Sequence, residues 1–367
     1  MEPNPFIPSL TEQEKHIGKH PRPPHFFATW LQQEDKPIAP GKKHRKLDAV
    51  DTERTNAVEH VARWLIAHLI PTGTQRSLQA KKNAILKKRE YERYLKGRLP
   101  NSITTRTGNC GEIILCEYLA SSSGMTPIVF QYNRNVDQSI KGDDVLLFDV
   151  QNLKNKVIVG ESKFRSNTPS TVEVEDILKN MGGKVRLPIS IPFAEGILRE
   201  AGNDILADEL MELMVDVELK RVPVVNVGFI MSNENAANPI ENHHLYGNFR
   251  MTDDTINQLQ AASFPISHIQ VLKLKTFANE SSLRKAIGKR LEKAKVPDFK
   301  KLIQTHRQTI FDYSEKSHNP ALVFITLGVT DPDKFVSECF ARANNILRNE
   351  IDSLVSLQVS QPQSTQP

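Results

Sequence analysis

Two short apolar runs near the middle of the chain constrain the fold most. Residues 142–150 and 157–165 are rich in Val, Ile, Leu and Phe, and the segment between them is polar, with asparagines at Asn152 and Asn155. Short β-branched runs on either side of a polar segment are typical of a β-hairpin. The same runs contain carboxylates and a lysine, which a buried strand tolerates when they are paired or bound to an ion. They therefore predict a strand pair that carries a charged site.

The period-two alternation of a strand predicts which charged residues share a face. Glu161 and Lys163 point the same way. If the turn is centred between residues 153 and 154, Asp144 lies across from Lys163 and diagonal to Glu161, roughly 7–8 Å from it. A one-residue slip would bring Asp143 to that face instead. We favour Asp144, because it directly precedes the apolar strand. The same face continues as a buried wall of Leu146, Phe148, Val157 and Val159.

Two carboxylates beside a lysine are suited to a divalent metal and a phosphate. Mg²⁺ prefers oxygen ligands, so Asp144 and Glu161 are the predicted metal ligands, and Mn²⁺ is an expected substitute. A bound ion lowers the pKa of a water and offsets charge on the leaving oxygen. Lys163 would hold that water or stabilise the extra negative charge of the transition state. In the alternative, Asp144 caps a turn and Glu161 with Lys163 forms a solvated pair, which the buried flanks disfavour.

A predicted helix upstream adds a third carboxylate. Residues 111–119 have apolar residues at the i, i+1, i+4 and i+5 spacing of a helix that packs on a sheet. Glu112 falls in the first turn of this predicted helix, and Gly124 ends it. Residues 128–130 then begin a strand that leads towards Asp144.

This region resembles the PD-(D/E)XK nuclease superfamily. In that superfamily the order of elements is a helix with an early glutamate, a strand, a second strand that begins at an aspartate, and a third strand with the E-x-K motif. The sequence departs from that pattern where Gly142 and Asp143 replace the nominal proline. More narrowly, residues 111–115, 141–144 and 160–164 resemble the HamA family of nuclease subunits from the Hachiman antiphage defence system. The resemblance implies an α/β, restriction-endonuclease-like core, with a mixed central sheet flanked by helices and an N-terminal helical extension.

The resemblance also implies a function. A member of this family would be a metal-dependent DNase that works with a superfamily 2 helicase, HamB, and is held in check until the complex senses aberrant DNA. The catalytic residues carried over to this chain are Glu112, Asp144, Glu161 and Lys163. Two alternatives stay open: a catalytically silent DNA-binding, scaffold or sensor subunit, and a restriction- or repair-type endonuclease of the same superfamily.

The positive charge of the chain is unevenly distributed. The net charge is +5, but residues 76–98 carry nine bases against two acids, and residues 284–301 form a second basic stretch. Either stretch could neutralise DNA phosphates, which would make affinity fall with salt. A solvated helix face or an acidic protein partner fits the same pattern. The candidate DNA contacts are Lys81, Lys82, Lys87, Lys88, Arg89, Arg165 and Lys179.

The motifs, the charge distribution and the apolar spacing together predict four segments along the chain. They are an N-terminal arm and basic helical region (1–100), a nuclease core (101–280), a C-terminal α/β extension packed on the core (281–357) and a disordered tail (358–367). Residues 1–50 are predicted to be largely irregular, and residues 52–70 are predicted to form a helix. Later helices are predicted at 174–181, 194–214 and 332–356, and later strands of the sheet at 222–230, 268–274 and 321–327.

The remaining features favour a cytoplasmic protein. Neither a signal peptide nor an apolar run long enough to span a membrane is evident, so no membrane partner is expected. The three cysteines, Cys110, Cys116 and Cys339, form no CxxC pair, so they are expected to be buried thiols.

Overall fold

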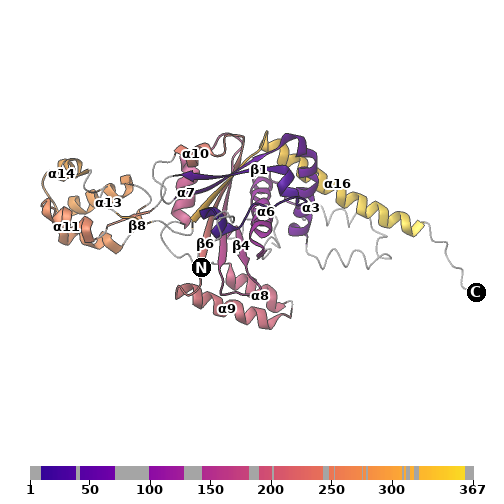
Figure 1. Ribbon diagram of the computed structural model, residues 1–367, viewed down its shortest axis with the longest axis horizontal. Coiled ribbons are helices and arrows are strands. Elements are labelled where there is room, and N and C mark those ends of the chain that lie inside the picture. Colours follow the sequence, from indigo (N-terminus) through magenta and orange to yellow (C-terminus); the bar gives the residue numbers. More distant parts are fainter. Residues whose placement is uncertain are drawn as a thin grey trace, which may run out of the picture.

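A seven-stranded mixed sheet forms the centre of the protein in a computed structural model (Figure 1). Its strand order is β1 (Leu31–Ile38), β2 (Lys42–Ala49), β10 (Leu322–Gly328), β6 (Val224–Ser232), β5 (Val157–Phe164), β4 (Val145–Phe148) and β3 (Thr126–Pro127). Strands β2, β10, β6 and β5 are parallel, while β1, β4 and β3 are each antiparallel to their neighbours. The structure describes residues 10–38, 42–70, 99–127, 143–181, 190–200, 202–242, 248–251, 253–274, 276–277, 280–307, 310, 315–317 and 322–359.

Helices cover both faces of this sheet, as the sequence predicts. One face packs against α1 (Glu12–Ile17), α2 (Phe26–Trp30), α3 (Arg54–Leu69), α6 (Ile103–Ser123) and α16 (Pro332–Val359), and their apolar side chains form one buried cluster. The other face packs against α7 (Thr171–Met181), α8 (Ile191–Glu200), α9 (Asp204–Glu218) and α10 (Asn238–Asn242). The hairpin contributes to both clusters, with Val145 and Ile158 on the first side and Leu146 and Val159 on the second.

The predicted hairpin is present, and an aspartate organises its turn. The side chain of Asp149 accepts hydrogen bonds from the backbone N–H of Gln151 (3.1 Å) and Asn152 (3.2 Å) and from the amide of Asn155 (3.0 Å). Such side-chain to backbone bonds replace the ladder that the turn lacks. Strands β4 and β5 are buried on both faces over their apolar stretches, as expected.

Helix α6 begins earlier than the sequence indicates. It starts at Ile103, so Glu112 lies in its interior, and the prediction that Glu112 occupies the first turn is wrong. Gly108 and Gly111 both lie inside the helix. At Gly111 the reason is packing, since a Cβ there would lie 2.8 Å from Ser162 Oγ on β5.

Residues predicted as an irregular arm contribute two strands to the sheet. Strands β1 and β2 pair antiparallel from Leu31↔Ala49 to Ile38↔Lys42, and β2 also pairs with β10. The prediction of an irregular arm is therefore wrong for residues 31–38 and 42–49, whereas the single amphipathic turn expected near Phe26, Phe27 and Trp30 is present as α2. The misleading signal in this segment was its high content of charged residues, which β2 accommodates in part by burying the ion pair between Arg45 and Asp35 (2.7 Å).

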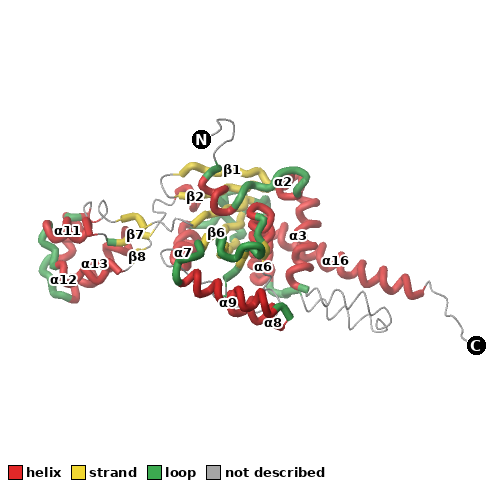
Figure 2. The backbone as a smooth tube through the Cα atoms, turned by 60° about the horizontal axis from the view of Figure 1, so that its bottom comes forward, coloured by secondary structure: helices red, strands yellow, loops and turns green. Residues whose placement is uncertain are grey.

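Residues 248–317 form a separate lobe, which we call the insertion lobe because it lies in the chain between β6 and β10 (Figures 1 and 2). Its three-stranded sheet has the order β8 (Thr276–Phe277), β7 (Asn248–Arg250) and β9 (Glu315–Ser317). Its helices are α11 (Asp253–Ala261), α12 (Ile266–Ile269), α13 (Glu280–Lys293) and α14 (Phe299–Thr305), with a 3-10 helix, η3, at Gln270–Leu274. They enclose an apolar cluster of their own.

Two further element predictions need correction. The strand predicted at 268–274 is helical, because Ile269 and Leu272 are buried at a spacing of three while Val271 is exposed. The single helix predicted at 194–214 is divided into α8 and α9 near Gly202, whose φ of +75° favours glycine. Helices α3, α7 and α16 and strands β6 and β10 are confirmed close to their predicted positions.

Other predicted features lie partly or wholly outside the described residues. They are the strand at 128–130, the basic stretch at 76–98 and residues 360–367 of the predicted tail, while residues 358–359 belong to α16. No helix in the described ranges is both long and apolar enough to cross a membrane. The described cysteines are all buried and free.

The close packing at Gly228 generates a prediction about stability. A Cβ at this position on β6 would lie 2.5 Å from Ile177 Cγ2 and 2.9 Å from Phe324 Cε1. We expect Gly228→Ala to lower the free energy of unfolding by about 1–3 kcal/mol, as overpacking of a core does. Gly196, inside α8, has open space around it, so Gly196→Ala should raise stability by about 0.5–1 kcal/mol. Urea unfolding of both variants checks this pair; equal effects would contradict it.

Candidate charged site at the carboxyl edge of the sheet

Asp144 and Glu161 face each other at the end of the β4–β5 pair. The register pairs Val145 with Gly160, and its continuation brings Asp144 opposite Glu161. The backbone N–H of Ser162 donates a 2.7 Å hydrogen bond to Asp144 Oδ2 and fixes that carboxylate. The predicted register, with Asp144 across from Lys163, is wrong by two residues. Because a shift of two preserves side-chain direction, the predicted face is nevertheless the observed one.

Asp143 lies in a different environment from Asp144. Its backbone N–H donates to Ser190 Oγ (2.8 Å), and its Oδ2 accepts from the backbone N–H of Ser190 (3.1 Å). Both residues are buried. This reciprocal pair ties the start of β4 to the chain before α8, so the structure brings Asp144, and not Asp143, beside Glu161.

Lys163 completes the row along β5. Its Nζ donates a 2.8 Å hydrogen bond to Glu161 Oε1, so the predicted E-x-K pair does share a face. Glu161 is only 8% exposed, whereas about a quarter of the Lys163 side chain is accessible (26%). On the neighbouring strand, Glu161 is paired with Gly228, whose missing side chain leaves α7 close to the sheet at this level.

Glu112 approaches the pair from α6, on the other side of the hairpin. Burial is the main cause that raises the pKa of Asp144, and the negative charges of Glu112 and Glu161 raise it further, to about 8. The Ser162 N–H and Lys163 oppose this shift but do not overcome it. Three carboxylates and one lysine therefore interact electrostatically at this site. When the carboxylates are ionised, the site carries a net negative charge close to buried strands.

The oxygen donors of this site fit a hard divalent cation. Mg²⁺ is commonly held by one or two carboxylates and completes its shell with water and phosphate oxygens. Asp144 and Glu161 supply such a pair. Burial is the main cause of the raised pKa of Asp144, and the negative charges of Glu112 and Glu161, which raise it further, are charges that a cation would offset. Among the described residues, no group of three or more His, Cys, Asp and Glu side chains is arranged to hold a metal by itself.

The candidate DNA contacts are only partly placed by the structure. Arg165, just after β5, is about half exposed and donates from Nε to Glu173 Oε1 (2.7 Å). Burial acts to raise the pKa of Glu173, but hydrogen bonds from Ser170 and Arg165 lower it below its ordinary value. The backbone of Lys179 lies in α7, and its side chain is outside the described atoms. Lys81, Lys82, Lys87, Lys88 and Arg89 lie outside the described residues.

Sequence reasoning did not find several of these partners. The backbone N–H of Ser162 and the Asp143–Ser190 pair depend on contacts across the fold, for which a single sequence gives no signal. Glu173 could have been found, because it lies three residues after Ser170, which is the spacing of a helix cap, and directly before the helix predicted at 174–181.

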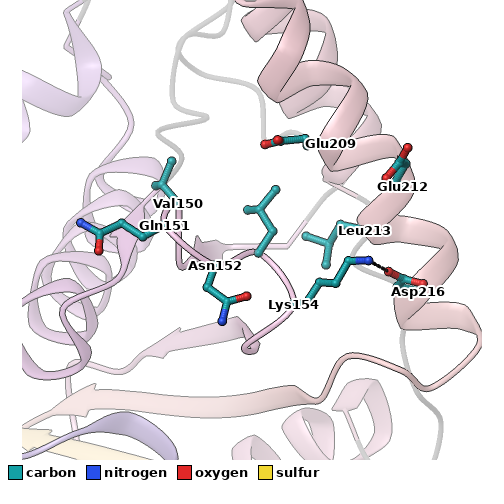
Figure 3. A pocket seen from close by; sticks show the side chains of 9 residues that line it. Val150, Gln151, Asn152, Lys154, Glu209, Glu212, Leu213 and Asp216 are labelled. Atoms are coloured by element: carbon teal, nitrogen blue, oxygen red, sulfur yellow. Dashed lines mark ion pairs between the residues drawn. The ribbon is translucent and has the colours of Figure 1, made fainter.

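A hollow of about 330 Å³ lies at the opposite end of the hairpin from the carboxylates (Figure 3). The β4–β5 turn and α9 line it from two sides, and Lys154 Nζ lies 3.5 Å from Asp216 Oδ2 across it. Glu209 and Glu212 add negative charge to the α9 side. An acidic hollow repels phosphate, so it does not extend the charged site towards a nucleic acid.

Fold and site together define an α/β protein that carries a carboxylate–lysine site at the carboxyl edge of the parallel strands in its central sheet. The sequence profile of the HamA family matches residues 24–343 of the chain, a span that includes β10 and most of the preceding elements. The chain belongs to the HamA family, which confirms the resemblance drawn from its motifs. It is similar to the Hachiman protein HamA of Bacillus cereus, with 38% identity over 238 residues, 64% of this chain and 85% of that protein.

The raised pKa of Asp144 predicts a pH-dependent stability. The folded state keeps the Asp144 proton up to about pH 8, whereas the unfolded chain releases it near the ordinary value of 3.8. This carboxyl therefore supports the fold fully below about pH 4, and its contribution is lost as pH rises through 8. Asp144→Asn cannot ionise and retains an oxygen for the Ser162 N–H.

We expect Asp144→Asn to match the wild type near pH 4 and to be more stable by about 1–3 kcal/mol at pH 8.5, since one pKa unit corresponds to about 1.4 kcal/mol. Urea unfolding in EDTA at several pH values measures the difference. Asp176→Asn, at an exposed position on α7, is the matched control. A stability difference for Asp144→Asn that does not grow with pH would contradict the assignment.

Proposed function

We propose that this protein is a metal-dependent DNA nuclease that acts in antiphage defence. The observation that carries the proposal is the placement of Asp144 opposite Glu161, with Lys163 Nζ 2.8 Å from Glu161 Oε1, at the carboxyl edge of the parallel strands. Membership of the HamA family supports the role in defence, because the curated relative is a Hachiman protein. The helix–strand–strand order around the site supports a PD-(D/E)XK type of core.

Each side chain of the site has a role in this proposal. Asp144 and Glu161 would hold Mg²⁺, or Mn²⁺ in its place, between two strands that fix their separation. When bound, the ion supplies an activated water and offsets negative charge on the leaving oxygen. Lys163, which is partly accessible, stabilises the extra charge on the phosphate or orients the water. Glu112 adds negative charge from α6 and strengthens the attraction for the cation.

The proposal extends to the partner. We infer that the chain is the effector subunit of a complex with a HamB-like superfamily 2 helicase, with DNA as substrate. The resemblance to HamA supports the pairing, and no Gly-rich phosphate loop is evident in the sequence, so ATP hydrolysis would have to come from another chain. The assays below therefore use the chain alone and the chain with its cognate helicase.

Removing a charged group from the site should abolish DNA cleavage. We expect Glu161→Gln and Lys163→Ala each to reduce plasmid nicking in Mg²⁺ or Mn²⁺ by at least about 100-fold, the usual cost of losing one charge-stabilising group in a preorganised site. EDTA should have the same effect on the wild type. Gel-based nicking rates, together with thermal unfolding to confirm the fold, measure this.

Two variants of the same chemistry serve as controls. Glu175→Gln on α7 and Lys154→Ala in the hairpin turn change exposed residues away from the carboxylate pair and should leave the nicking rate unchanged. Wild-type cleavage by both Glu161→Gln and Lys163→Ala would refute the proposed site.

The two neighbouring aspartates should behave differently. Asp144→Asn is expected to lose cleavage like Glu161→Gln, because it removes a predicted metal ligand. Asp143→Asn keeps an oxygen that can accept from the Ser190 N–H, so its nicking rate should stay within a few-fold of wild type below its melting temperature. Calorimetric titration with Mg²⁺ provides a second readout, and equal loss of Mg²⁺ binding in the two variants would contradict the assignment.

A further inference from the structure

The insertion lobe presents a row of lysines on the outside of α13. The inner side of this helix buries Leu283, Ile287 and Leu291, which recur every four residues. Lys285, Lys289 and Lys293 recur with the same spacing, two residues further along, and all three are exposed. At 3.6 residues per turn, this offset places them on the solvent side, opposite the buried row. We call these three residues the lysine row.

The lysine row is not neutralised by neighbouring acids. Residues 280–307 contain nine bases and three acids. No ion pair or hydrogen bond joins a lysine-row ammonium group to any residue that the structure describes. Glu292 is the exposed acid nearest in sequence, and it too lacks an ion pair with the row within the described part of the lobe. An uncompensated row on a rigid helix is a surface that attracts a polyanion.

Other parts of the lobe fix the position of the row. Helix α14 packs on α13 at Gly288, where a Cβ would lie 3.4 Å from Ile303 Cδ1 and 3.8 Å from Phe299 Cε2. It adds two exposed bases, Lys300 and Lys301, to the same small lobe. Because α13 is anchored through its buried row, the ammonium groups are carried by a rigid element and not by a loop.

We propose that the lysine row binds the phosphate backbone of duplex DNA, as a contact separate from the charged site. Successive lysines are about 6 Å apart along the helix, and the row spans about 12 Å, a length over which a duplex presents several phosphates. A single strand is usually held by aromatic side chains on which bases stack. The phenylalanines of the lobe whose side chains the structure describes, Phe264, Phe277 and Phe299, are buried or partly buried, which favours the duplex.

This inference deepens the proposed function, since it assigns a second surface to the same substrate, and it can fail independently. Binding is measured in EDTA, where the metal-dependent step does not occur. If the protein did not cleave DNA, the lobe could still bind a duplex. If the lobe did not bind a duplex, metal-dependent cleavage could still be observed.

The test is the affinity of the full chain for a short fluorescein-labelled DNA duplex, measured by fluorescence anisotropy over a range of salt concentrations. The variant Lys285→Gln/Lys289→Gln/Lys293→Gln removes three charges and keeps residues with good helix propensity. We expect it to bind about 10- to 100-fold more weakly at low salt, with the slope of log K against log salt reduced by about 2 to 3.

The matched control removes three charges from the main body of the protein. Lys154→Gln/Lys220→Gln/Lys334→Gln changes exposed lysines outside the lobe and should change affinity by less than about two-fold, because counterion release depends on the phosphates contacted locally and not on net charge alone. A second variant tests the opposite sign. Glu292→Gln removes the nearby acid and should tighten duplex binding by about two- to three-fold.

Three results would overturn the proposal. The lysine-row variant could bind the duplex with the same affinity and salt slope as the control variant. The loss could be confined to the single strand of the same sequence. Finally, the variant could bind the duplex as tightly as the wild type but fail to bind polyglutamate, used as a probe for an acidic protein surface. That result would assign the row to an acidic protein partner instead.

Discussion

The antiparallel register of β4 on β5 determines the direction of every strand-borne side chain in the charged site. With Val145 paired to Gly160, Asp144 comes opposite Glu161, and the alternation of β5 brings Lys163 to the same side. The hydrogen bond from Ser162 to Asp144 exists only in this register. A slip by one residue would put Asp144 and Glu161 on opposite faces of the sheet and would exchange the side chains that β4 contributes to the two apolar clusters, so the packing of the core and the orientation of the site depend on the same register.

The same burial that fixes the site makes its negative charge costly. Val145 and the residues around Gly160 exclude water from the base of the pair, and Glu112 adds a like charge from α6. The raised pKa of Asp144 is the consequence, and in the proposed nuclease a proton and a cation would compete for this carboxylate. Lys163 relieves part of the charge, yet its hydrogen bond goes to Glu161 and not to Asp144.

Local patterns in the sequence predicted the hairpin, the shared face of the charged residues and helices α3, α7 and α16, while the resemblance implied that helices flank the sheet. The local patterns worked because alternation and apolar spacing are properties of short segments. The exact turn was not predictable in this way, since Asp149 gathers three donors and shifts the register by two residues. The start of α6 was predicted too late, at Gly111. A glycine is needed there inside the helix because a larger side chain would clash with Ser162 on β5. Strands β1 and β2 were missed because their charges are satisfied across the fold, by a cross-strand pair between Asp35 and Arg45 and by the distant Glu241, which pairs with Lys36.

The position of β10 in the chain has a consequence for how the protein is made. This strand lies between β2 and β6, yet it follows the whole insertion lobe, so its partners on β6 and β2 are separated from it by about 96 and 280 residues. Pairings over such distances form late in folding, because the loop entropy must be overcome first. The middle of the sheet therefore cannot close before residues 322–328 have been synthesised. A nascent chain that ends within the lobe has the hairpin with its charged residues but lacks the strand that joins β2 to β6.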